Sequence, residues 1–163
     1  MSAESLTALE PVVAQLLDRH LANAKEWFPH EYVPWERGRS YTEAPWEPAD
    51  SALSATARTA LELNLLTEDN LPYYHLAIWN LFGGRGAWGE WARRWTAEEA
   101  RHSIAIRDYL LVTRSVDPVA LERERMEHMS RGYYPRRIDN PLDGLVYVTL
   151  QELATRIAHR NTG

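Results

Sequence analysis

The sequence contains no cysteine, and this absence narrows the chemistry open to the protein. Without thiols the chain cannot form disulfides, thiolate zinc sites or cysteine-ligated iron–sulfur clusters. Any transition metal must be held by histidine and carboxylate side chains, and the sequence supplies 6 His and 23 Asp plus Glu for that purpose.

Long apolar runs and an excess of positive charge are also missing. No stretch approaches the ~20 apolar residues of a membrane-spanning helix, and residues 1–13 lack the basic start and apolar core of a secretory signal. The net charge of −5 disfavours non-specific binding to nucleic acid. We therefore expect a cytoplasmic protein, and its 163 residues, 45% of them apolar, suffice for one domain with a core.

Apolar residues recur at helical spacing through most of the chain. They predict helices over residues 4–25, 51–66, 67–82, 88–113, 118–130 and 141–159. Asp50 and Ser51 are the expected caps of the second helix, and Thr67 is the expected cap of the third. Residues 27–50 hold four prolines among aromatic residues and predict an irregular arm on the surface. Period-two alternation is rare, so the predicted fold class is all-α.

Glu99 and His102 lie three residues apart on one predicted helix, so their side chains leave the same face. A Glu-x-x-His pair can offer a metal one carboxylate oxygen and one imidazole nitrogen. The same residues also suit a solvated helix face with internal salt bridges. The motif alone leaves both interpretations open.

A carboxylate-bridged metal site in a helical bundle also needs a lone Glu on each facing helix, and the candidates are Glu68 and Glu152. Glu68 also fits the acidic first turn of a helix. Glu152 is flanked by leucines, and an unpaired buried acid is unfavourable by several kcal/mol. Glu152 therefore lies at the edge of the apolar stripe or has a partner such as a metal. Thr155 follows one turn later on the same face.

Four segments, taken in order, resemble motifs of the soluble acyl-[acyl-carrier-protein] desaturases. The family's arm motif W-x-P-x-[DE]-[FY]-L-P is similar to Trp27–Pro34, and its T-E-E-A-L-P-T-Y is similar to Thr67–Tyr73. Its W-T-A-E-E-N-R-H is similar to Trp95–His102. Its Y-T-S-F-Q-E-R-A-T, followed by H-G-N-T, is similar to Tyr147–Thr162. The resemblance covers residues 23–163, and four motifs in the right order with compatible spacing are highly specific.

The resemblance implies a ferritin-like helical bundle with two iron ions. Such an enzyme of fatty acid biosynthesis uses O₂ and ferredoxin electrons to insert a cis double bond into a fatty acyl chain on acyl carrier protein, and it is expected to be a homodimer. Glu68 and His102 would ligate one iron, Glu99 would bridge the two, and Glu152 would be the terminal ligand of the second. Thr155 matches a threonine beside the oxygen-binding side, and Trp27 matches a tryptophan on the electron route.

Plainer roles stay open for several of these residues. Trp27 could simply anchor the arm, and Thr155 could bond only to helix carbonyls. The histidines outside the Glu-x-x-His motif match no family ligand and are interpreted as packing or surface residues: His20, His30, His75, His128 and His159.

The family's bundle needs a second Glu-x-x-His beyond the position of Glu152, and the sequence stops at Gly163. We therefore expect residues 1–163 to form an incomplete ferritin-like domain without its fourth metal-bearing helix. It would comprise an N-terminal helix (1–26), the arm (27–50) and bundle helices (51–163). The sequence is then a piece of a longer enzyme, or a chain completed by another polypeptide, or a short product that is not a desaturase.

By itself this chain is expected to be inactive, to hold at most one metal weakly, and to self-associate through its open groove. Two rival functions remain. One is another di-iron chemistry on the same bundle, such as peroxide or iron handling. The other is a non-catalytic helical module that binds acyl carrier protein or a partner helix, which would take up no ferrous iron.

Overall fold

A computed structural model describes residues 3–134 and 138–162. The helices are α1 (Ala3–Asn23), α2 (Ala55–Asp69), α3 (Leu71–Phe82), α4 (Gly86–Val112), α5 (Pro118–Arg131) and α6 (Pro141–Thr162), with short 3₁₀ turns at Pro29–Glu31, Trp35–Arg37 and Pro48–Asp50. The described residues form no β-strand. The all-α prediction is confirmed, and each helix ends within four residues of its predicted bounds.

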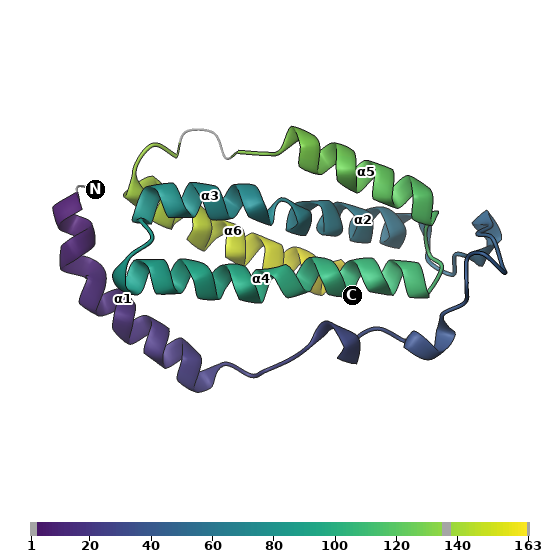
Figure 1. Ribbon diagram of the computed structural model, residues 1–163, viewed down its shortest axis with the longest axis horizontal. Helices are drawn as coiled ribbons and strands as arrows, with labels where there is room; N and C mark the ends of the chain where they lie inside the picture. Colours follow the sequence, from purple (N-terminus) through teal and green to yellow (C-terminus); the bar gives the residue numbers. More distant parts are fainter. Residues whose placement is uncertain (1–2, 135–137, 163) are drawn as a thin grey trace.

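Helix α4 is the longest element and the centre of the arrangement. It contacts α1, α2, α3 and the first 3₁₀ turn, whereas α6 contacts α2 and α3. Figure 1 shows α2 and α3 following one another alongside α4, with α6 behind them, α5 on the outer side and α1 across one end. The metal-ligand candidates thus come from three neighbouring helices, α2, α4 and α6.

Two clusters of buried apolar side chains hold these helices together. One joins α2, α4 and α5 through Leu65, Leu110, Val116 and Leu121, and the other joins α3 and α4 through Ile78, Phe82, Trp88 and Ala92. Leu6, Leu9 and Val13 of α1 pack against the second cluster. The two clusters lie toward opposite ends of α4, and the stretch between them carries Glu99 and His102.

The break between α2 and α3 differs from the prediction. Thr67 and Glu68 end α2 instead of beginning α3, and the chain turns at Asn70. Pro72 has no N–H and is tolerated only in the first turn of a helix, so α3 restarts just before it. The buried Asn70 side chain bonds the backbone N and O of Tyr133, both at 2.9 Å.

The predicted caps of α2 were wrong. Ser54 caps this helix by accepting a hydrogen bond from the Ala57 N–H at 3.1 Å. Asp50 instead accepts from Arg114, whose Nε and Nη2 lie 2.9 and 2.7 Å from its Oδ2. Arg114 follows α4 in the left-handed region, with φ of 56°, and also donates to the carbonyls of Ala44 and Pro45. This contact fixes the far end of the arm to the end of α4.

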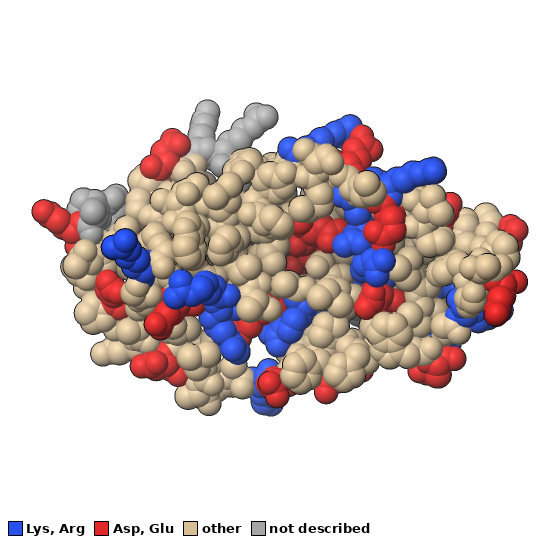
Figure 2. All heavy atoms as spheres, viewed as in Figure 1, with Lys and Arg blue, Asp and Glu red and all other residues tan. Residues whose placement is uncertain are grey.

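One side of α6 is apolar and exposed. Five apolar residues recur there at helical spacing, each 47–61% exposed: Leu142, Val146, Leu150, Leu153 and Ile157. We call this set the α6 apolar row. Figure 2 shows acidic and basic side chains interspersed over the face in view. Among the described residues, no helix has the length and apolar character needed to cross a membrane.

Candidate metal centre

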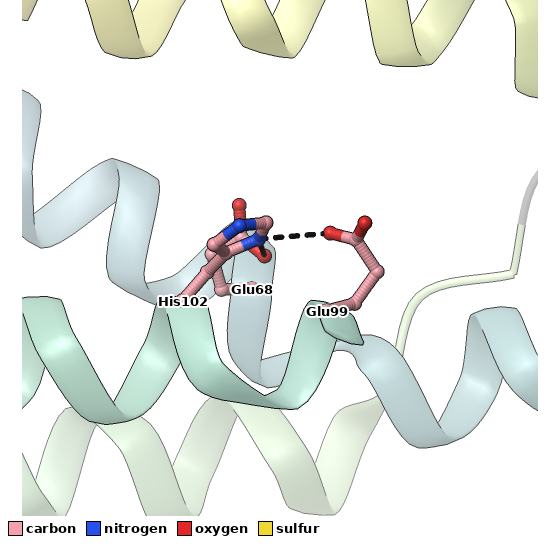
Figure 3. A group of neighbouring side chains, drawn as sticks. All are labelled: Glu68, Glu99 and His102. Carbon is pink, nitrogen blue, oxygen red and sulfur yellow. Dashed lines mark hydrogen bonds and ion pairs between the residues drawn. The ribbon is translucent and has the colours of Figure 1, made fainter. Parts of the chain in front are cut away.

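Three of the predicted ligands come together. One ligand atom each from Glu68, Glu99 and His102 lies within 4.8 Å of the others, the only such group among residues 3–134 and 138–162. Figure 3 shows Glu99 and His102 one turn apart on α4, with Glu68 reaching them from α2. His102 Nδ1 lies 2.9 Å from Glu99 Oε2 and 3.6 Å from Glu68 Oε2. Two carboxylates and an imidazole suit iron and similar divalent metals.

Charge and hydrogen bonding prepare these groups for a cation. Burial raises the pKa of the Glu68 carboxyl, but the contacts with His102 and His159 outweigh it and leave the pKa below its usual value. The neighbouring carboxylates of Glu68 and then Glu99 raise the pKa of His102 to about 10. In the metal-free chain His102 therefore carries a proton on Nδ1, which a metal bound there must displace.

Metal affinity should rise with pH for this reason. Below the His102 pKa of about 10, each bound metal releases one proton, so the apparent Co²⁺ affinity should increase about tenfold per pH unit. Absorbance titrations at several pH values between 6.5 and 9 would measure the slope. Affinity that does not change with pH would show that His102 gives up no proton to the metal.

The same raised pKa has the opposite effect on the metal-free fold. Protonated His102 stabilises the folded chain fully below pH 6.5, its pKa in the unfolded chain. This stabilisation is lost as the pH rises toward the folded-state pKa of about 10. Metal-free protein should therefore become easier to unfold across this interval while its metal affinity improves. Urea unfolding curves recorded with a chelator present would follow this loss.

The three ligands line a cavity of about 1170 Å³ between α2, α4 and α6. Glu152, Thr155 and His159 of α6 face the same space. Away from the ligands the lining becomes apolar, with Leu53, Ala57, Leu61 and Ile106. A polar, cation-suited group thus adjoins a long apolar compartment.

Glu152 stands outside the ligand group. Its Oε1 accepts a hydrogen bond from Trp95 Nε1 at 3.1 Å, so this indole is the partner that the sequence required. Burial, followed by the charge of Glu99, raises the pKa of the Glu152 carboxyl. A second cation between these carboxylates would reverse that effect, and the assignment of Glu152 to a second iron stays a prediction.

Thr155 lines the cavity but bonds to its own helix. Its hydroxyl lies 3.0 Å from the Gln151 carbonyl oxygen and 3.3 Å from that of Glu152. The structure therefore shows Thr155 bonded to helix carbonyls. A role for Thr155 beside bound oxygen stays a prediction.

His159 was interpreted from the sequence as a packing or surface residue, and the structure adds a contact with a metal-ligand candidate. Its Nε2 lies 2.8 Å from Glu68 Oε1. The available signal was its spacing from Glu152: seven residues are about two helical turns, so both side chains leave the same face of α6.

Trp27 is held directly against the ligand group. Its indole stacks on the His102 imidazole with ring centres 5.5 Å apart and planes 14° from parallel. The Arg101 guanidinium lies 4.5 Å from the centre of the Trp27 ring, and Arg101 Nη1 donates to the Trp27 carbonyl at 3.0 Å. Trp27 thus anchors the arm, and the same contact brings an indole to a metal-ligand candidate.

Arg101→Met should loosen the near end of the arm. It removes a cation–π contact and a charged hydrogen bond together worth about 1–3 kcal/mol. Amide exchange in residues 27–33 should quicken by roughly 5- to 150-fold, as measured by mass spectrometry. Arg94→Met is the matched control, because exposed Arg94 on the same helix pairs with Glu98. Equal exchange in both variants would contradict the anchor.

The chain was compared with known families and structures. A family model described as fatty acid desaturase matches residues 1–163. DesA1 of Mycobacterium tuberculosis, named as an acyl-[acyl-carrier-protein] desaturase, is 52% identical over 97% of this chain and 50% of its own length. An orchid protein of Ophrys sphegodes, named palmitoyl-[acyl-carrier-protein] 4-desaturase 3, is 33% identical over 85% of this chain and 37% of its own.

The fold has a solved counterpart. The X-ray structure of DesA2 from Mycobacterium tuberculosis superposes with a TM-score of 0.61 at 39% identity, covering 81% of this chain and 48% of that one. The expected ferritin-like helical fold is thereby confirmed. The chain spans about half the length of the relatives it matches. It belongs to the fatty acid desaturase family, which includes the acyl-[acyl-carrier-protein] desaturases.

Proposed function

We propose that this chain supplies half of the metal centre and part of the substrate channel of an acyl-[acyl-carrier-protein] desaturase. The observation that carries the proposal is the convergence of Glu68, Glu99 and His102 at the wall of a cavity with an apolar end. The names of the relatives supply the substrate class, a fatty acyl chain on acyl carrier protein.

The ligand group is suited to its part in this reaction. Glu68, Glu99 and His102 would hold one iron, and Glu99 and Glu152 would offer ligands to a second. When bound, the iron pair supplies the activation of O₂ that removes two hydrogens from the acyl chain. The apolar lining at Leu53, Leu61 and Ile106 receives that chain and excludes water from it.

Electrons reach the metal through Trp27 in this proposal. The stacked indole and imidazole put the arm in direct contact with a ligand of the first iron. The proposed source is a ferredoxin-type protein. Arg101 fixes the indole in the position that this role needs.

The remaining ligands come from outside these residues. A second Glu-x-x-His helix would lie over the α6 apolar row and would remove its five exposed apolar side chains from contact with water. The completed subunit forms a homodimer, as expected from the family resemblance. Until that helix is present, the row favours self-association, which sedimentation of this chain alone would reveal.

The test uses the protein expressed from its natural gene at the length that gene encodes. It is loaded with Fe²⁺ without oxygen and then given acyl carrier protein bearing saturated chains of several lengths, ferredoxin, a reductant and O₂. Mass spectrometry of the released acids should show the loss of two hydrogens. Iron uptake without this product would favour another di-iron chemistry. Binding of the acylated carrier without iron uptake would favour the non-catalytic module.

A further inference from the structure

We infer that His159 is a positioning residue that holds the Glu68 carboxylate in the orientation a metal requires. The inference rests on the proposed metal centre and adds to it a residue from α6. His159 Nε2 contacts Glu68 Oε1 at 2.8 Å, whereas the other oxygen, Oε2, is the one that faces His102 Nδ1 at 3.6 Å. The two oxygens of one carboxylate are thus divided between two histidines.

The direction of this hydrogen bond follows from the chemistry of the two groups. Both Glu68 carboxylate oxygens face a histidine nitrogen, and a carboxylate can only accept a hydrogen bond. His159 Nε2 must therefore carry the proton and donate it. A nitrogen that donates a hydrogen bond has no lone pair for a metal, so in this arrangement His159 orients a ligand and is not one itself.

The spacing of the atoms agrees with this assignment. His159 does not belong to the group whose ligand atoms all lie within 4.8 Å of one another. Its ring centre lies 6.4 Å from that of His102, and the planes are tilted by 37°. The Glu68 side chain is only 10% exposed, and each of its carboxylate oxygens faces one of the two imidazoles.

The backbone around His159 is fixed by a neighbouring polar contact. Asn64 Nδ2 of α2 donates to Thr162 Oγ1 of α6 at 3.3 Å. Asn64 lies one turn before Glu68, and Thr162 lies one turn after His159. The end of α6 is thus joined to α2 at two successive turns, through Asn64–Thr162 and Glu68–His159. Only the Glu68–His159 contact involves a metal-ligand candidate.

The chain provides a matched control in a second histidine–glutamate pair. His20 Nε2 of α1 contacts Glu98 Oε2 of α4 at 2.9 Å, so this pair also joins two helices. Glu98, however, is additionally bound by Arg94 and is absent from the ligand group. Removing His20 therefore tests the loss of an interhelical pair without touching the proposed centre.

The experiment measures Co²⁺ binding by visible absorbance in protein of natural length. His159→Phe should weaken Co²⁺ binding about 10- to 100-fold, the usual effect of removing a partner of a metal ligand. His159→Gln keeps an N–H donor, so its affinity should fall between those of the parent and the Phe variant. His20→Phe should bind as the parent does. If the Phe variant does not fold, His159→Ala takes its place with the same expected loss.

Two results would overturn the inference. One is parent-like affinity in the folded Phe or Ala variant. The other is a Gln variant that loses as much as Phe and shows the absorption change of a lost nitrogen ligand, which would make His159 a direct ligand. A parent protein that binds no Co²⁺ would refute the proposed centre itself, so the two failures are distinguishable.

Discussion

Glu99→Ala should abolish tight metal binding. The residue supplies one of the three converging ligand atoms and accepts the hydrogen bond of His102 at 2.9 Å, so its loss removes a ligand and disturbs a second. We expect Co²⁺ or Fe²⁺ affinity to fall by more than the roughly 100-fold that removal of an outer partner can produce. Anaerobic titration followed by visible absorbance would measure this loss.

The neighbouring residue provides the control for this substitution. Glu98→Ala removes an acid from the same turn of α4, but Glu98 pairs with His20 and Arg94 at the surface. Its loss should leave metal affinity within a factor of about two of the parent. Equal losses in the two variants would mean that overall negative charge, and not a defined centre, attracts the cation.

Leu65→Ala should produce a large loss of stability. Leu65 is completely buried where α2 meets α4 and α5, in contact with the cluster that contains Leu110 and Leu121. Truncation of a buried leucine leaves a cavity and lowers the free energy of unfolding by about 2–5 kcal/mol. Urea unfolding of the natural-length protein, followed by circular dichroism, would measure it.

Leu63→Ala is the matched control, because Leu63 lies two residues earlier on the same helix with 62% of its surface exposed. Its free energy of unfolding should change by no more than about 0.5 kcal/mol. Equal losses of unfolding free energy in the two variants would mean that α2 does not turn Leu65 toward the core.

The helices were predictable because each buries a stripe of apolar side chains at helical spacing. Local pattern could not decide between the end of one helix and the start of the next at Thr67 and Glu68. An acid preceded by threonine fits a helix start, but the turn depends on buried Asn70 pairing with Tyr133, a residue 63 positions away. Contacts between distant residues outweighed local propensity at this point.

The ligand candidates were found for a similar reason, since Glu-x-x-His is a local motif whose spacing alone brings two side chains together. The roles of His159 and Arg114 could not be found in this way. His159 meets Glu68 across 91 residues, and Arg114 meets Asp50 across 64. Both contacts exist only because the bundle brings α6 to α2 and the arm to the end of α4.

The two fixed ends of the arm have a mechanical consequence. Trp27 is held at Arg101 and residues 44–50 are held at Arg114. Arg101 lies within α4 and Arg114 lies just after its end, about 20 Å further along the helix direction. The Trp27 indole and the far end of the arm are therefore both attached to the helix that carries His102. A displacement of α2 or α6 relative to α4 would therefore leave the 5.5 Å separation between the Trp27 and His102 ring centres unchanged.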